Sequence, residues 1–222
     1  FIETTGIHGF RLDAIKHIDS FFMGNFIRDI MAKYGEDFYV FGEFWNGDET
    51  ANNDYLGSID YRFDLVDVKL HHNLFDASRA GADYDLRNIF EQTLVKNHPK
   101  SAVTFVDNHD TQRGQALEST VEEWFKPAAY ALILLREAGL PCVFYGDYYG
   151  IKGEFAQDSF QTVLDKLLDI RLNLAYGKQK DYFDDEHCIA WTRSGKDNEQ
   201  PIAVIISNDQ ANSKRMYVGE NW

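Results

Sequence analysis

Short apolar runs alternate with longer amphipathic stretches along roughly the first 175 residues of the chain. This alternation is typical of β/α units that build a parallel sheet. The apolar positions Phe22, Phe26, Ile27 and Ile30, for example, recur at helical spacing. The pattern predicts strands at residues 6–12, 38–42, 58–63, 102–106 and 142–145, and helices around 21–31, 65–74, 85–94, 124–137 and 161–174.

The pattern changes after Gly177, where apolar runs are joined by short polar turns. Strands are predicted at residues 188–192, 202–207 and 215–218, and this arrangement is typical of an antiparallel sheet. We therefore expect two domains, 1–178 and 179–222. Five β/α units fit part of an eight-stranded barrel, and they also fit a doubly wound sheet.

Charge and composition narrow the classes of partner. The chain has 36 acidic and 22 basic residues, a formal net charge of −14, which would repel the phosphates of a nucleic acid. No apolar run is long enough to span a bilayer, so no membrane partner is expected. Aromatic residues make up 15% of the chain, and their rings could stack on sugars, although most are expected in the core.

The two cysteines and the two chain ends bear on compartment and completeness. Cys142 and Cys188 have apolar neighbours, which predicts small buried side chains rather than a disulfide and favours the cytoplasm over secretion. The chain begins at Phe1 inside an ordered-looking segment and ends just after a predicted strand. We therefore expect both ends to be cuts within a longer protein.

Carboxylates follow the first two predicted strands. Arg11 and Asp13 should face the same side of the first strand, because side chains alternate along a strand. A neighbouring guanidinium favours an ionised, oriented carboxylate, which suits a nucleophile, although Arg-x-Asp is more often a structural ion pair. Glu43 ends the second strand between aromatic residues, an apolar setting that favours the protonated form of a general acid.

Four polar residues, Asp107, Asn108, His109 and Asp110, come directly after the fourth predicted strand. They must face a polar site or solvent unless they are paired, although Asp and Asn also favour turns. Three carboxylates that end three strands of one sheet are less easily explained as coincidence than any one of them. Two could form the acid and nucleophile pair of a retaining glycosidase, whose carboxyl groups lie ~5–5.5 Å apart.

Three segments, residues 9–17, 42–45 and 105–111, resemble signature regions of the α-amylase family in the right order. Further segments, residues 98–99, 117–121, 124–127, 143–147 and 214–219, are similar to the bacterial liquefying α-amylases and their intracellular relatives. The resemblance implies strands 4 to 8 of a (β/α)8 TIM barrel in residues 1–178. It also implies the start of an antiparallel β-sandwich C-terminal domain in residues 179–222, and endo-hydrolysis of α-1,4-glucan.

The resemblance also implies a role for individual residues. Asp13 matches the nucleophile, Glu43 the general acid/base, and Asp110 the third carboxylate, which binds hydroxyls of the reacting sugar. The matching substrate-binding residues are Arg11, Lys16, His17, Trp45 and His109. The backbone carbonyl of His17 matches one ligand of a structural calcium ion in the complete enzyme.

The sequence departs from the family pattern in three ways. The first signature region and the protruding subdomain, which supply the other calcium ligands, lie outside these 222 residues. The missing N-terminal part of the protein is therefore an expected partner, beside the α-glucan. At positions that match the side-chain ligands of a second metal in liquefying relatives, this chain has His187 and Asn208.

Three other functions compete with this interpretation. A metal-dependent hydrolase on the same barrel would need imidazoles at successive strand ends. Here Glu43 ends the second predicted strand and residues 60–62 end the third, without a histidine. His71 and His72 fall in a predicted helix instead. The chain could also be a non-catalytic glucan-binding fragment. Within the family, it could belong to a transglycosylase or to an enzyme for small maltooligosaccharides.

Overall fold

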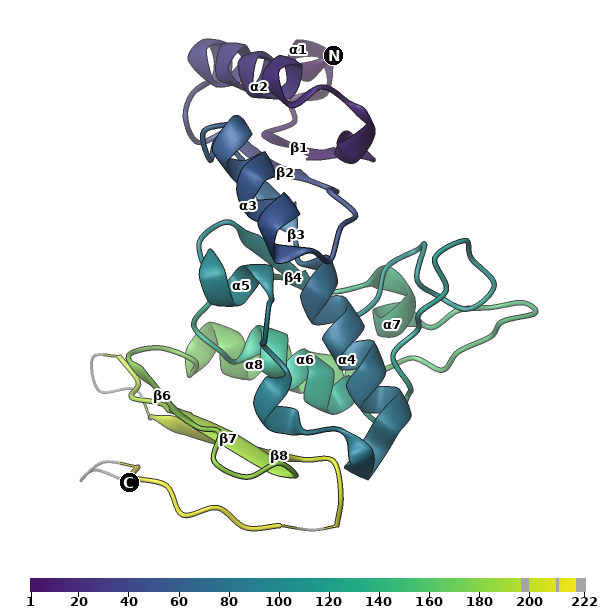
Figure 1. Ribbon diagram of the computed structural model, residues 1–222, viewed down its shortest axis with the longest axis vertical. Helices are drawn as coiled ribbons and strands as arrows, with labels where there is room; N and C mark the ends of the chain where they lie inside the picture. The colour runs from purple at the N-terminus through teal and green to yellow at the C-terminus, as the bar shows by residue number, and fades with distance from the viewer. Residues whose placement is uncertain (197–199, 211, 219–222) are drawn as a thin grey trace.

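A computed structural model describes residues 1–196, 200–210 and 212–218. Its main sheet has five parallel strands in the order β1-β2-β3-β4-β5, which confirms the parallel sheet predicted from the sequence (Figure 1). The strands are β1 (Gly9–Leu12), β2 (Tyr39–Gly42), β3 (Asp64–Val66), β4 (Ala102–Phe105) and β5 (Leu140–Cys142). Strand order follows chain order, so each strand pairs with its neighbours in sequence and all carboxyl ends lie along one edge.

Helices connect these strands. The longer helices are α2 (Ser20–Tyr34), α3 (Glu49–Ser58), α4 (Val68–Ala80), α6 (Lys126–Leu134) and α8 (Gln161–Asn173); the shorter ones are α1 (Ile2–Thr5), α5 (Leu94–Asn97) and α7 (Tyr145–Tyr149). Of these, α2, α3, α4 and α5 begin at a side-chain cap. The side chains of Asp19, Asp48 and Asp67 accept backbone N–H groups of the first turns of α2, α3 and α4. Such caps satisfy donors that have no partner within the helix.

The core lies around β4, whose four residues are all buried. Helix α6 packs behind it and is almost entirely apolar, with residues 129–134 all buried. Fully buried Leu65, Leu70 and Leu74 come from β3 and α4 on the same core. The carboxyl end of β4 is therefore held more firmly than the ends of the outer strands.

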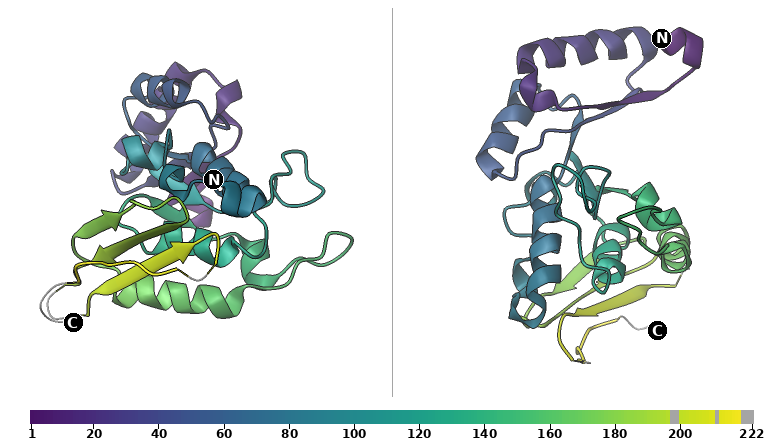
Figure 2. Two further views of the ribbon diagram at one scale, coloured as in Figure 1. Left: turned by 60° about the horizontal axis from the view of Figure 1, so that its bottom comes forward. Right: turned by 90° about the vertical axis from the view of Figure 1, so that its right-hand side faces the viewer.

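A second sheet has three antiparallel strands, β6 (Gln179–Tyr182), β7 (Cys188–Arg193) and β8 (Ile202–Ser207). The right-hand view of Figure 2 shows it at the opposite end of the molecule from α1 and α2. Buried Trp191 and the guanidinium of Arg136 attach it to the main core, and Arg136 stacks on Trp191 and pairs with Asp181 through two contacts of 2.8 Å. The division into two domains at residue 178 stays a prediction.

The third strand and its flanking helices were predicted wrongly. Residues 49–58 form α3, and β3 begins only at Asp64, because Asp60 and Tyr61 adopt left-handed conformations that form a turn. Ile59 and Phe63 are buried anchors of that turn, which explains why the segment resembles a strand. Asp67, not residues 60–62, follows the third strand, and α4 starts at Val68 rather than near residue 65.

Several other boundaries also differ. The predicted helix at 85–94 is replaced by a short 3-10 turn (Leu86–Asn88) and α5, since left-handed Gln92 interrupts it. The fifth strand ends at Cys142, and Tyr145 starts α7. Residues 215–218 form no strand; this segment is held by Tyr182, whose hydroxyl bonds both backbone groups of Tyr217. The first strand begins at Gly9, after α1.

Cys188 is buried, as predicted, and both cysteines are free. Cys142 is exposed, contrary to prediction, because its strand is at the end of the described part of the sheet. Within the described ranges, no helix has the length and apolar character required to cross a membrane.

Candidate active site

The ends of β1 and β2 are joined by backbone hydrogen bonds. Glu43 N–H donates to the carbonyl of Leu12 at 2.8 Å, and Ile15 N–H donates to the carbonyl of Glu43 at 3.1 Å. Gly42 allows this close approach, because a side chain there would overlap Ile15. Asp13 and Glu43 therefore follow adjacent strands at the same level.

Arg11 contacts both carboxylates. Its Nη1 pairs with Asp13 Oδ1, and its Nη2 lies 3.2 Å from Glu43 Oε2. Ala14 N–H also donates to Glu43 Oε2, at 3.1 Å, and Ala14 takes a left-handed conformation with φ of 47°. The side chain of Glu43 is 8% exposed and that of Asp13 is 71% exposed. The Glu43 carboxylate is therefore almost buried, whereas the Asp13 carboxylate is open to solvent.

An Asx turn shapes the segment after β4. Asn108 Oδ1 accepts the backbone N–H groups of Asp110 and Thr111, both at 2.9 Å. This turn presents His109 and Asp110 at the surface, and His109 Nε2 lies 3.3 Å from Asp110 Oδ2. Asp107 is buried but paired, with its Oδ2 2.9 Å from Lys126 Nζ, and it also contributes to the lining of the pocket at the strand ends.

A pocket of about 290 Å³ lies along the carboxyl ends of the strands. It brings together Arg11, Glu43 and His109 from three of the predicted positions, and its floor includes Phe41, Val66, Val103 and Phe105. Asp13 and Asp110 are not part of its lining, but each contacts a residue that is. The predicted residues of β1, β2 and β4 thus converge on one pocket.

The residues after β5 also line this pocket, and the sequence analysis did not select them. Val143, Phe144 and Tyr145 lie beside His109 and Glu43, and Tyr145 is 72% exposed. The sequence pattern placed these residues inside the fifth strand, which in fact ends at Cys142, so the rule that site residues follow strand ends did not point to them.

Lys16, His17 and Trp45 are not part of the lining of this pocket. Lys16 Nζ donates to the carbonyl of Trp45 at 3.4 Å, and the ring of Trp45 packs near His71 and Phe105, with centroids 6.1 Å apart in both cases. His17 is exposed at the end of the 3-10 turn Ile15–His17.

The predicted calcium site is not formed by this chain alone. Ca²⁺ takes ~6–8 oxygen ligands, whereas His17 offers one carbonyl, and the described residues contain no group of three or more His, Cys, Asp and Glu side chains suited to a metal. Asn208, at a position where liquefying relatives have a metal ligand and where no metal was predicted in this chain, donates its amide to the carbonyls of Gly81 and Tyr84 at 2.7 Å. These residues therefore do not fit a resident metal by themselves.

Two buried ionisable groups support the segment after β4. Burial raises the pKa of Asp107 to about 6, although the nearby ammonium of Lys126 opposes this shift. Burial lowers the pKa of His71 to about 4, and its Nδ1 lies 2.6 Å from the carbonyl of Val106. At neutral pH His71 is therefore uncharged.

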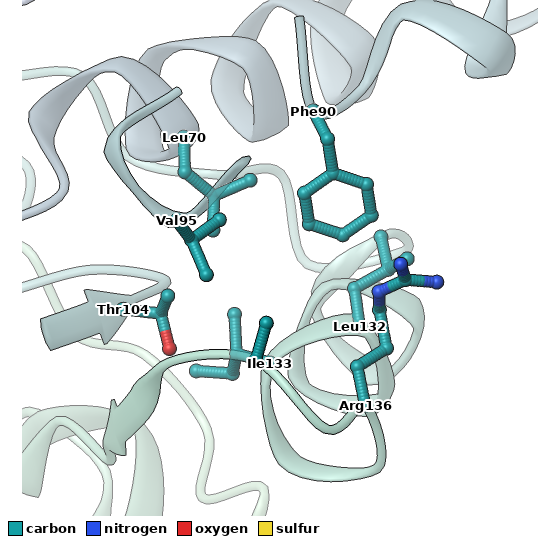
Figure 3. A pocket seen from close by; sticks show the side chains of 8 residues that line it. Leu70, Phe90, Val95, Thr104, Leu132, Ile133 and Arg136 are labelled. Atoms are coloured by element: carbon teal, nitrogen blue, oxygen red, sulfur yellow. The ribbon is translucent and has the colours of Figure 1, made fainter. Parts of the chain in front are cut away.

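A smaller cavity of about 40 Å³ lies away from the strand ends, between α4, β4 and α6 (Figure 3). Leu70, Val95 and Ile133 surround it, and the Thr104 hydroxyl that faces it has no hydrogen-bond partner. A trapped water needs two or more polar partners, so this cavity is a packing gap rather than a substrate site.

Comparison with known proteins shows the family to which the chain belongs. The family described as "Alpha amylase, catalytic domain" matches residues 1–216. The chain is 46% identical to a glucan 1,4-alpha-maltohexaosidase of Bacillus sp. (strain 707), 43% identical to an alpha-amylase of Bacillus licheniformis and 41% identical to a cytoplasmic alpha-amylase of Escherichia coli (strain K12). These alignments cover 97–100% of this chain but 43–46% of the relatives, so the chain spans less than half their length.

Solved structures show the same fold at lower identity. An alpha-amylase from Anoxybacillus superposes with a TM-score of 0.66 at 23% identity, covering 93% of this chain and 49% of the other. A cyclic alpha-maltosyl-(1→6)-maltose hydrolase from Arthrobacter globiformis also gives 0.66, at 22% identity, covering 92% and 49%. The family match, the parallel sheet and the converging strand ends together show that the chain belongs to the α-amylase family, in the catalytic domain of that family.

Proposed function

We propose that the complete protein is a retaining α-amylase that hydrolyses internal α-1,4-glucosidic bonds of starch, glycogen and maltooligosaccharides. The observation that carries this proposal is the shared guanidinium of Arg11, which holds Asp13 and Glu43 on adjacent strand ends at one pocket. A pair of close carboxylates is the arrangement that retaining glycosidases use. The names of two relatives reported above, a glucan 1,4-alpha-maltohexaosidase and an alpha-amylase, agree with this substrate class.

In this mechanism the exposed carboxylate of Asp13 attacks the anomeric carbon and forms a glycosyl ester. Glu43 gives its proton to the departing glycosidic oxygen and then takes a proton from the water that hydrolyses the ester. The Arg11 guanidinium orients both groups. His109 and Asp110 bind hydroxyls of the reacting sugar, and Lys16, His17 and Trp45 bind the sugars on the leaving-group side.

The finer architecture belongs to the same proposal. We infer that β1–β5 correspond to strands 4 to 8 of a (β/α)8 barrel, and that β6–β8 begin a β-sandwich domain. Upstream sequence of the same protein would supply the remaining strands and the other oxygen ligands of a calcium ion bound partly by His17. A calcium ion bound there would help hold the barrel end in shape.

Substitution of the two carboxylates tests the mechanism. In the full-length enzyme, Asp13→Asn and Glu43→Gln should each lower the rate on soluble starch by ~10²-fold or more, because an amide can neither attack nor transfer the proton. Glu49→Gln, an exposed neighbour in α3, should leave the rate unchanged. A rate above about a tenth of wild type in either active-site variant would refute its role.

Proton NMR of the first product supplies an independent readout. Initial release of the α-anomer is expected, since two displacements retain configuration. Initial β-anomer would exclude Asp13 as a nucleophile. Transfer of glucosyl units to another sugar instead of water would favour the transglycosylase alternative.

A further inference from the structure

A buried charge cluster lies directly beneath the segment that carries His109 and Asp110. Its centre is Lys126, the first residue of α6, which is 1% exposed. Asp107 at the end of β4 and Asp147 in α7 surround its ammonium, and their side chains are fully buried. The proposed chemistry does not use any of these three groups.

The ammonium of Lys126 joins three separate segments. Its Nζ lies 2.9 Å from Asp107 Oδ2, pairs with Asp147 Oδ1, and donates to Gln157 Oε1 at 3.0 Å. Gln157 also donates to Asp147 Oδ1 at 2.8 Å, and the Tyr130 hydroxyl donates to Asp147 Oδ2 at 2.5 Å. The end of β4, the start of α7 and the base of a loop at residue 157 therefore meet at one cation.

That loop, residues 151–157, also contacts the active-site segment, by which we mean the segment after β4 that carries His109 and Asp110. Its base is closed by reciprocal backbone hydrogen bonds between Ile151 and Gln157, at 2.9 and 3.0 Å. Near its tip, Phe155 lies so close to Gly114 that a side chain on the glycine would overlap its ring. Figure 1 shows the two loops, residues 110–119 and 151–157, extending from the same side of the molecule. The loop thus contacts the active-site segment at its far end, while Lys126 holds both at their bases.

Stability alone is a weak reason for such a cluster. Burying three charges carries a large desolvation cost, and well-packed apolar residues can often replace a buried ion pair without loss of stability. A cation with three oxygen partners does, however, define the relative position of the segments that carry them. Asp107 also restrains the segment itself, because its Oδ1 accepts a hydrogen bond from the Thr111 hydroxyl at 3.1 Å. Thr111 directly follows Asp110 in the chain, so the position of Asp107 affects that of Asp110.

We propose that Lys126 is a positioning residue, which fixes His109 and Asp110 over the pocket by binding Asp107 and Gln157 beneath them. The expected effect on catalysis rests on the proposed function, whereas the expected effect on the position of the segment does not. It concerns the alignment of Asp110 with the reacting sugar, and misplacement of a catalytic group by ~1 Å can lower a rate ~10²-fold.

The test uses three variants of the full-length enzyme. Lys126→Met removes the cation but leaves two buried carboxylates unpaired, which could prevent folding. Gln157→Leu removes one arm of the cluster and leaves both ion pairs intact, so it should fold. Lys152→Met, an exposed lysine on the same loop, is the matched control. The measurements are kcat and KM on maltoheptaose, the midpoint of thermal unfolding, and amide hydrogen exchange.

We expect Gln157→Leu to lower kcat about tenfold with less than a twofold change in KM, and to speed exchange selectively at residues 108–117 and 151–157. Lys152→Met should match wild type. A kcat within twofold of the control, or exchange that rises equally in β1, β2 and β4, would overturn the proposal. If the wild-type enzyme does not cleave maltoheptaose, the proposed function fails. Positioning by this cluster is tested separately by hydrogen exchange, because unchanged exchange at residues 108–117 in Gln157→Leu would refute it.

Discussion

The same side chain serves different purposes at neighbouring strand ends. Asp67, after β3, is fully buried and accepts backbone N–H groups of Leu70, Leu94 and Val95, so it holds α4 and α5 in place. Asp107, after β4, is paired with Lys126, whereas Glu43, after β2, contacts Arg11 and the backbone N–H of Ala14. The chemistry of a carboxylate is therefore set by its surroundings rather than by its place at a strand end.

At the scale of a single residue, His71 gives a prediction about how the free energy of unfolding depends on pH. Because burial lowers its pKa to about 4, the native state binds fewer protons than the unfolded state between pH 6.5 and 4. Stability from this group is complete above pH 6.5 and is lost as the pH falls through that window. Between pH 7.5 and 4.5 the loss should be ~2–3 kcal/mol of the free energy of unfolding.

Urea unfolding at both pH values should therefore show a weaker pH dependence for His71→Gln than for wild type. The exposed residue His8 gives the matched control, His8→Gln. Asp107, whose raised pKa acts in the opposite direction, is common to all three proteins and cancels in the comparison. Equal pH dependence in wild type and His71→Gln would show that His71 is not held neutral by burial.

At the scale of elements, the catalytic pair depends on how closely β1 approaches β2. Gly9 faces Tyr39 in the register of the two strands, and a methyl group on Gly9 would overlap the backbone carbonyl oxygen of Tyr39. A backbone atom in a strand cannot move aside without shifting the strand. Any residue but glycine at this position should therefore separate the strands that carry Asp13 and Glu43.

We predict that Gly9→Ala lowers the free energy of unfolding by ~1–3 kcal/mol, the usual effect of overpacking. Gly57→Ala is the control, because a methyl group there meets open space in α3 and should stabilise the helix by ~0.5–1 kcal/mol. Denaturant titration of the two variants measures both effects. Equal stability of the Gly9→Ala protein and wild type would mean that the strands separate without strain.

At the scale of the whole molecule, β1 and β5 each pair on one side only within the described part of the chain. A β/α barrel closes only when strand number, tilt and shear agree. Asp13 follows one of the two outer strands, and an unpaired strand edge invites association with other chains. In the proposed eight-stranded barrel, the geometry at Asp13 depends on strands outside the five described here.

We accordingly predict that a purified polypeptide of these 222 residues does not hydrolyse starch, although it contains all three proposed catalytic carboxylates. Reducing-sugar release from soluble starch is the measurement, with the full-length enzyme as positive control. Joining the upstream segment to it, or adding that segment separately, should restore activity. Turnover by the isolated polypeptide near the full-length rate would disprove the need for barrel closure.

The local pattern of apolar residues was sufficient for the parallel sheet, for β7 and β8 of the antiparallel sheet that follows it, and for the strand ends near Arg11, Glu43 and His109; it missed β6 and wrongly placed a strand at residues 215–218. These features depend on periodicity and chain order, which the sequence contains directly. Only the tertiary structure decided where β3 begins, because Ile59 and Phe63 are buried through a turn and imitate a strand. It alone also revealed Tyr145 in the pocket and the pairing of Asp107 with Lys126, since these contacts join residues far apart in the chain whose local patterns carry no record of their partners.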